Sequence, residues 1–249
     1  MNTPSHTVRS LIRLFVGLLV GASAVVVLPT TAHAATAYSV LQINMCNSGL
    51  ASCFTGRAQA GTIALIKART PYAVTLNESC SNDITAIANS AGYRGQFTQS
   101  GTQKCTNGYA YGNAVLFRPG VTATSVVRHT YTAQNSTVEK RTLSCASGAF
   151  RVCVTHLATS GTARTSQAEQ MKSIMASYNS GGVAILGGDW NMTYGGSPNA
   201  QTYVPSGMYR KGDGSVQHFI ASNGFAFSST RVMSLDWTDH PGFQLYVSR

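Results

Sequence analysis

Short apolar, β-branched runs recur along the chain, and a polar side chain lies at one end of most of them. Such runs, bounded by polar residues or glycine, predict buried strands. A rigid sheet positions the side chains at the ends of its strands, so these polar residues are expected to gather into one site. They are Asn44 after 40–43, Asn77 and Glu78 after 73–76, His156 after 152–155, Asp189 and Asn191 after 183–186, and Asp239 and His240 before 243–247.

The rest of the pattern predicts strands and helices without regular alternation. Strands are expected at 38–45, 72–76, 112–117, 142–145, 149–157, 183–186, 217–221 and 243–247, and helices at 57–68, 84–90 and 165–178. Many strands with few intervening helices favour a layered α/β sandwich over a doubly wound sheet. Segment 192–214 is rich in glycine and proline and has no period, which predicts a long loop, either functional or a surface insertion.

The first 34 residues have the features of a signal peptide. Arg9 and Arg13 precede an apolar run over 14–28, and Ala32-His33-Ala34 is a small-x-small cleavage site. The alternative is a retained anchor, but the run is short for a span of about 20 residues. We therefore expect cleavage after Ala34, one domain over 35–249, an extracellular location and no stable membrane insertion.

The six cysteines all follow the predicted cleavage site. An even number in an exported chain predicts disulfides, although spacing alone does not determine the pairing. We favour sequential pairing, because Cys145 and Cys153 flank the turn-like Ala146-Ser147-Gly148 and could lie on adjacent strands. A zinc site is the alternative, and the absence of a C-x-x-C pair from the sequence argues against it.

The charge balance favours a polyanionic partner. The whole chain carries +10, and loss of Arg9 and Arg13 with the leader leaves +8. Positive charge favours nucleic acid or an anionic lipid surface, although solubility alone also explains it. The sequence has only eight carboxylates, so those at the predicted strand ends are a large share of the total.

The polar residues at the strand ends suit metal-assisted phosphoester chemistry. Carboxylates with amide oxygens are ligands for Mg²⁺, with Mn²⁺ as the alternative. A divalent cation lowers the barrier to phosphodiester hydrolysis by neutralising phosphoryl and leaving oxygens. His156 and His240 are the candidate proton carriers, because imidazole titrates near neutral pH. Each residue alone also has an ordinary interpretation as a turn former, a cap or a surface group, so the prediction depends on their joint occurrence.

The same motifs resemble those of the endonuclease/exonuclease/phosphatase superfamily, to which the DNase I-like nucleases belong. They appear in the family order and cover nearly the whole mature chain. The resemblance implies a four-layer α/β/β/α sandwich of two packed mixed β-sheets flanked by helices. The motifs are Gln42-Ile43-Asn44-Met45, Leu76-Asn77-Glu78, Thr155-His156-Leu157, Leu186-Gly187-Gly188-Asp189-Trp190-Asn191 and Thr238-Asp239-His240-Pro241.

The resemblance also implies a role for each residue. Glu78 would bind the metal, with Asn44 and Asp239 nearby. The catalytic group would be Asp189 and Asn191, which position nucleophile and phosphate, with His156 and His240, which serve the phosphate and the proton transfers.

Two departures from the family pattern concern substrate and histidine contacts. Gln217 occupies the position of the usual Asp that orients the C-terminal histidine, and its oxygen could accept from the His240 ring. Tyr111 stands where DNase I has a phosphate-contacting arginine. With Asn113 on the same strand, and Arg210 and Lys211 in the long loop, it is expected to bind substrate.

These observations predict a secreted, monomeric, metal-dependent phosphodiesterase acting on nucleic acid, with DNA favoured. The first alternative is a sphingomyelinase-like or phosphoinositide phosphoesterase. The sequence has no run of consecutive aromatic residues suited to membrane insertion, which argues mildly against it. The second alternative is a catalytically weakened binding protein on the same scaffold, which Gln217 makes conceivable.

Overall fold

The strands form two mixed sheets of six strands each in the computed structural model, which describes residues 1, 34–53 and 55–249. The first sheet has the order β11-β12-β1-β2-β4-β3 and the second β5-β6-β7-β8-β10-β9. The first comprises β1 (Ala37–Asn44), β2 (Ala73–Cys80), β3 (Arg94–Lys104), β4 (Ala110–Phe117), β11 (Ala226–Met233) and β12 (Gly242–Ser248). The second comprises β5 (Thr124–Thr130), β6 (Thr142–Ser147), β7 (Arg151–His156), β8 (Ala184–Asp189), β9 (Met208–Gly212) and β10 (Gln217–Ser222).

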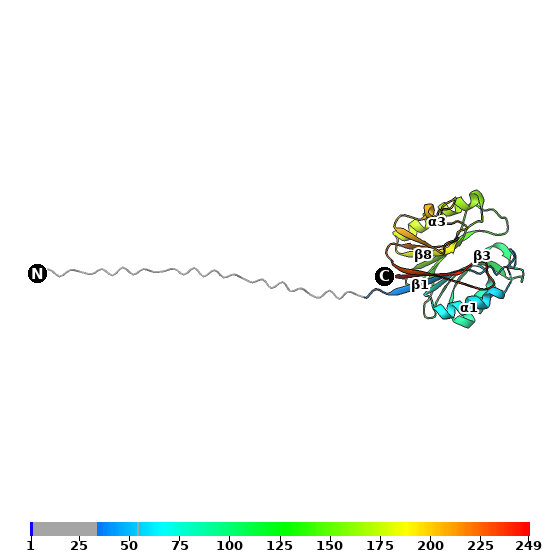
Figure 1. Ribbon diagram of the computed structural model, residues 1–249, viewed down its shortest axis with the longest axis horizontal. Helices are drawn as coiled ribbons and strands as arrows, with labels where there is room; N and C mark the ends of the chain where they lie inside the picture. The colour runs from blue at the N-terminus through cyan, green and yellow to red at the C-terminus, as the bar shows by residue number, and fades with distance from the viewer. Residues whose placement is uncertain (2–33, 54) are drawn as a thin grey trace. The chain divides into compact units, whose positions relative to one another are not determined.

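The sheets pack face to face, and helices cover their outer faces. α3 (Gly161–Ser180) lies on the second sheet, whereas α1 (Arg57–Arg69) and α2 (Ser81–Ala91) lie on the first (Figure 1). Three apolar clusters match these contacts. One, with Phe117, Phe219 and Phe243, fills the space between the sheets, and one lies beneath each helical layer. The predicted four-layer sandwich is confirmed.

One parallel strand pair in each sheet places polar residues at the same end of the sandwich. β1 and β2 run parallel with Asn44 opposite Asn77, and β7 and β8 run parallel with His156 opposite Asp189. Parallel neighbours end on the same side, so both sheets present their polar termini to one region. The polar residues that follow the apolar runs are therefore brought together at one end of the sandwich.

Four strands that the sequence analysis did not predict are β3, β5, β9 and β11. Each is the outermost strand of its sheet. An edge strand has one neighbour and need not carry a continuous apolar run. β11, for example, is exposed along almost its whole length. Segment 192–214, predicted as a loop, contains β9 and the short helix η1 (Ala200–Tyr203).

The disulfides pair sequentially, as predicted: Cys46–Cys53, Cys80–Cys105 and Cys145–Cys153. Cys145 and Cys153 face each other across β6 and β7. No helix in the described residues is long and apolar enough to cross a membrane. The predicted signal peptide covers residues 1–34, of which residues 2–33 lie outside the described part of the chain.

Candidate active site

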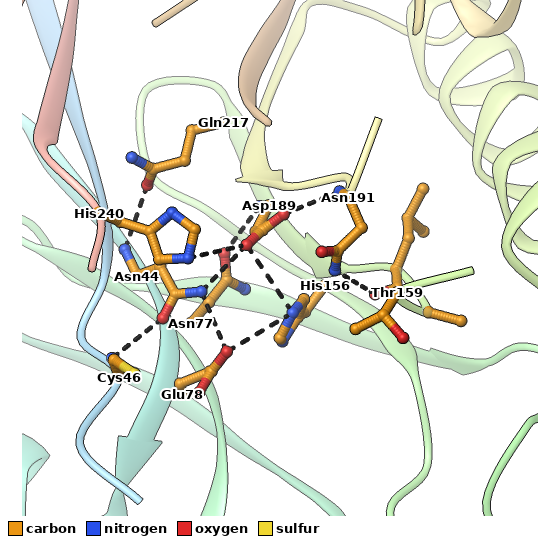
Figure 2. Close-up of polar contacts among 12 residues, drawn as sticks. Asn44, Cys46, Asn77, Glu78, His156, Thr159, Asp189, Asn191, Gln217 and His240 are labelled. Atoms are coloured by element: carbon orange, nitrogen blue, oxygen red, sulfur yellow. Dashed lines mark hydrogen bonds and ion pairs between the residues drawn. The ribbon is translucent and has the colours of Figure 1, made fainter. Parts of the chain in front are cut away.

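Asn44 joins acidic side chains from the two sheets. Its Nδ2 donates to Glu78 Oε1 at 3.1 Å and to Asp189 Oδ2 at 3.0 Å (Figure 2). Its Oδ1 accepts the backbone N–H of Cys46 at 3.0 Å. The amide nitrogen, rather than the oxygen expected of a metal ligand, thus faces the carboxylates. Asn44 acts in this arrangement as a bridge that holds two acids of different sheets at one point.

Both bridged acids lie in an environment that opposes their negative charge. Burial raises the pKa of Glu78, and the charge of Asp189 raises it further against the lowering effect of the Asn44 hydrogen bond. Burial also raises the pKa of Asp189, while His240 and hydrogen bonds from Asn191 and Asn44 lower it. The two carboxylates therefore form a concentration of charge that a cation would relieve.

The two histidines flank these acids. His156 Nε2 lies 3.8 Å from Glu78 Oε1 and 3.9 Å from Asp189 Oδ2, beyond hydrogen-bond range. His240 Nε2 lies 3.5 Å from Asp189 Oδ2 and 3.4 Å from Asp239 Oδ1. Burial lowers the pKa of His156 well below its ordinary value, and the nearby Arg141 and His240 add to this effect. His156 is therefore neutral near neutral pH and can offer an N–H to a ligand.

The end of β8 contains a required glycine, and the turn after it contains one strained residue. A Cβ on Gly188 would lie 2.1 Å from the carbonyl oxygen of Thr155, so the close approach of β7 and β8 requires glycine there. Asn191 adopts a left-handed φ of 52°. Its N–H donates to Asp189 Oδ1 at 2.8 Å, and its Nδ2 donates to the Leu157 carbonyl at 2.9 Å. These bonds hold Asn191 beside the acids at a conformational cost, as is common at functional sites.

Asn77, next to Glu78 on β2, forms hydrogen bonds that link the two sheets. Its Oδ1 accepts the backbone N–H of Asp189 at 2.9 Å, and its Nδ2 donates to the Thr155 carbonyl at 2.9 Å and to Asn113 Oδ1 at 2.8 Å. Asn77 and Asn113 are both buried. Asn113, predicted to bind substrate, supports Asn77 in this network.

Gln217 contacts the backbone around the site. Its Oε1 accepts the N–H of Asn44 at 3.2 Å, and its Nε2 donates to the Pro241 carbonyl at 2.7 Å and to Asp213 Oδ2 at 3.3 Å. The expected hydrogen bond to the His240 ring is not among the contacts of the described residues. Gln217 instead holds the chain segments that carry Asn44 and His240.

His218 holds the turn that carries Asn191. Its Nε2 is 2.7 Å from the Met192 carbonyl oxygen, and its Nδ1 is 2.9 Å from Arg210 Nη1. A guanidinium can only donate, so Nδ1 accepts and the ring proton is on Nε2. Arg210 also donates to Gln201 and lies over the Tyr194 ring. Arg210, predicted to bind substrate, therefore ties the long loop to the sheet.

The acids and histidines line one cavity of about 430 Å³. Of the residues predicted to bind substrate, Tyr111 lines this cavity, whereas Arg210, Lys211 and Asn113 do not. Lys211 instead places its Nζ over the Phe227 ring. A depression of about 480 Å³ elsewhere on the surface is lined by neither a carboxylate nor a histidine. The smaller cavity is therefore the candidate active site, because it has the ionisable side chains. The predicted residues on its wall are Glu78, Tyr111, His156, Asp189, Asn191, Asp239 and His240.

Arg141 is a wall residue that the sequence analysis missed. It is 7% exposed, and its Nη2 lies 3.1 Å from Glu139 Oε1. Its Nε and Nη1 have no hydrogen-bond partner among the described residues. A buried guanidinium with unpartnered N–H groups in a cavity is suited to an anion. The available signal was its position directly before β6, next to the strand that ends on His156.

The chain is similar to known proteins in sequence and in fold. The model of the Endonuclease/Exonuclease/phosphatase family matches residues 42–240. D. rerio TDP2, solved with a single-strand DNA product, has a TM-score of 0.68 at 12% identity, over 86% of this chain and 100% of that chain. An endonuclease/exonuclease/phosphatase family protein from Bacteroides thetaiotaomicron has a TM-score of 0.69 at 12% identity, over 87% of this chain and 96% of that chain. The mannosyl-6-phosphatase of Bacteroides thetaiotaomicron has a TM-score of 0.62 at 12% identity, over 84% of this chain and 98% of that chain.

A search of curated proteins returned no match. The structural likenesses are at low identity and establish the fold alone. The family model, by contrast, extends from the strand that carries Asn44 to the His240 of the cavity. The chain therefore belongs to the endonuclease/exonuclease/phosphatase family of phosphoester hydrolases.

Proposed function

We propose that the chain is a secreted, monomeric, divalent-metal-dependent phosphodiesterase that hydrolyses nucleic acid, with DNA as the favoured substrate. The observation that carries the proposal is the meeting of Glu78 and Asp189, from different sheets, with two histidines and the buried Arg141 in one cavity. Acids suit a cation and the guanidinium suits a phosphate, so the cavity has a place for each part of a metal-bound phosphodiester.

The residues present fit a divalent cation. Among the described residues, the cavity wall has four carboxylates and one guanidinium, and burial raises the pKa of both Glu78 and Asp189. Such an excess of oxygen donors suits Mg²⁺ or Mn²⁺. Glu78 and Asp239 would hold the ion, which when bound supplies charge neutralisation at the phosphoryl and leaving oxygens.

The chain's own residues account for substrate orientation and proton transfer. Neutral His156 donates an N–H to a phosphoryl oxygen, and Arg141 donates its unpartnered N–H groups to the same phosphate. Asp189, whose pKa is raised by burial, accepts the proton of the attacking water as the water oxygen bonds to phosphorus. The bond from phosphorus to the leaving oxygen breaks in the same step, and the leaving oxygen takes a proton from solvent. His240, 3.5 Å from Asp189, lies where it can share the proton that Asp189 accepts. Asn191, on the wall of the same cavity, contacts the phosphate.

Two observations support nucleic acid as the substrate. The formal charge after removal of residues 1–34 is +8, which attracts a polyphosphate backbone. D. rerio TDP2, which shares the fold, was solved with a single-strand DNA product. The fold also serves a mannosyl-6-phosphatase, so substrate class has to be measured rather than transferred. The three disulfides accord with export to an oxidising compartment.

A substrate panel tests the proposal. The purified chain 35–249 with intact disulfides would be assayed on supercoiled plasmid, single-stranded DNA, RNA and sphingomyelin or phosphoinositide vesicles. Each assay would be run with EDTA and after addition of Mg²⁺ or Mn²⁺. Metal-dependent cleavage of DNA is expected. Release of a lipid headgroup without nucleic-acid cleavage would establish the lipid alternative, and DNA binding without turnover would establish the binding-protein alternative.

A further inference from the structure

A second cavity adjoins the active site on the side of Asp239. Its volume is about 300 Å³, at the lower end of the range that holds small ligands. It shares Ala51 and Asp239 with the active-site cavity. Cys53, of the Cys46–Cys53 disulfide, and Trp237 contribute to its wall. A group bound there would lie directly beside a phosphate held in the active site.

Trp237 is presented to this cavity in an unusual backbone conformation. It has a left-handed φ of 65°, which is rare for a bulky residue and marks a strained position. The next residue anchors the loop, because Thr238 Oγ1 donates to the Asn44 carbonyl at 2.7 Å and accepts the N–H of His240 at 3.2 Å. Trp237 as a whole residue is 51% exposed. The loop therefore presents an aromatic side chain to solvent three residues before His240.

A positive charge accompanies the ring. The guanidinium carbon of Arg57 lies 4.6 Å from the centre of the Trp237 ring, in a cation–π contact. Arg57 is the first residue of α1, and the first turn of that helix contains no acidic residue. An aromatic ring beside an arginine is the combination that proteins use to hold a single-stranded nucleotide, with the base stacked and the phosphate paired.

We propose that this second cavity is a nucleobase subsite, in which the base next to the scissile phosphate stacks on Trp237, while Arg57, outside the cavity wall, adds positive charge beside the ring. The inference rests on the proposed nuclease function and deepens it. The subsite requires an unstacked base, so it favours single-stranded or frayed substrate over intact duplex. Stacking recognises the flat face that all bases share, so little sequence preference is expected.

Removal of one base from the substrate tests the subsite by kinetics. Single-stranded oligonucleotides with one cleavable linkage would carry an abasic residue on either side of it. The wild type is expected to lose roughly ten- to a hundred-fold in kcat/KM when the base on one side is missing. Trp237→Ala should be insensitive to that missing base, and Trp237→Phe should recover most of the dependence. Phe227→Ala, which truncates an exposed aromatic on β11, is the matched control and should behave as wild type.

Tryptophan fluorescence gives a second readout that does not need turnover. The chain has two tryptophans, of which Trp190 is fully buried. In the Glu78→Gln protein, intact oligonucleotide is expected to quench the emission of Trp237, and the abasic oligonucleotide should not. Quenching without cleavage by the wild type would reject the nuclease function and retain the subsite. Cleavage with neither quenching nor base dependence would reject the subsite alone.

Absence of any oligonucleotide binding also overturns the subsite. Sphingomyelin and phosphatidylserine vesicles provide the remaining arm of the experiment. A blue shift of Trp237 emission on these vesicles, without quenching by oligonucleotide, would assign the ring to lipid and overturn the proposal.

Discussion

At the scale of single residues, the site depends on neutral amides placed between charges. The Asn44 amide separates Glu78 from Asp189, and the Gln217 amide connects the segments that carry Asn44 and His240. Amides can donate and accept at once, which carboxylates cannot. The buried acids Glu78 and Asp189 therefore remain close together without direct contact.

Glu78→Gln is expected to lower activity on the order of a hundred-fold or more at saturating Mg²⁺, because it removes ligand charge while keeping volume. Thermal unfolding should show a folded protein. Glu169→Gln, which changes an exposed acid on α3, is the control and should retain full activity. Near-normal turnover of Glu78→Gln would remove Glu78 from the metal site.

Gln217→Asp is expected to lower the free energy of unfolding by about 1–3 kcal/mol, because it leaves the Pro241 carbonyl without its donor and adds a charge near Asp213. Gln217→Asn has a side chain of the same size as Asp but without its charge, so it separates the effect of the added charge from the effect of the shorter side chain. The pH–rate profile should keep its position in the Asp variant. An upward shift of its acidic limb would instead show that a carboxylate at 217 reaches the His240 ring.

At the scale of elements, the turn after β8 that carries Asn191 is held by the strands that follow it. Arg210 on β9 and His218 on β10 are linked to each other, and His218 is linked to Met192 directly after Asn191. Burial lowers the pKa of His218 to about 4, so this tie depends on a neutral ring. The position of Asn191 therefore follows from the packing of β8, β9 and β10 rather than from local turn preference.

Stability should fall as pH decreases from about 6.5 to about 4, because the unfolded chain protonates His218 more readily than the folded protein does. The full difference corresponds to about 3 kcal/mol. Denaturant unfolding across this pH range would measure it. His218→Gln can still donate to Met192 but does not titrate, so its stability should fall less over the same interval. Equal slopes for both proteins would contradict the assignment.

At the scale of the whole molecule, short covalent links support a sandwich that has four exposed edge strands. Each disulfide closes a local loop, with sequence separations of 7, 25 and 8. Cys145–Cys153 joins paired strands, and Cys80–Cys105 connects the end of β2 with the loop between β3 and β4. Loop closure restricts the unfolded chain more as the loop lengthens.

Replacement of the cysteine pairs by alanine should therefore lower stability in the order of loop length. Loss of Cys80–Cys105 is expected to cost roughly 3–4 kcal/mol and loss of Cys145–Cys153 roughly 2–3 kcal/mol. Mass spectrometry of the unreduced protein should find no free thiol. Two or more free cysteines under oxidising conditions would refute the pairing, and the reverse order of stabilities would refute the loop-length explanation.

The sequence by itself determined the central strands and identified three of the four acids and both histidines of the cavity wall. It favoured the sequential disulfides without determining them. Continuous apolar runs identify strands with two neighbours, and the polar residue after each run marks the edge where Glu78, His156 and Asp189 meet. These are local signals. The four edge strands lack them, because an outermost strand has exposed positions that polar residues satisfy.

Only the tertiary structure decided which side chains near these strand ends face the cavity. Arg141 lines the cavity because β6 pairs with the strand that ends on His156. Arg210 instead contacts His218, and the side chain of Asn113 accepts a hydrogen bond from Asn77. Each outcome depends on partners far away in the chain. A polar side chain is directed by the hydrogen bond that burial obliges it to make, and the two sheets supply that partner only when they pack together.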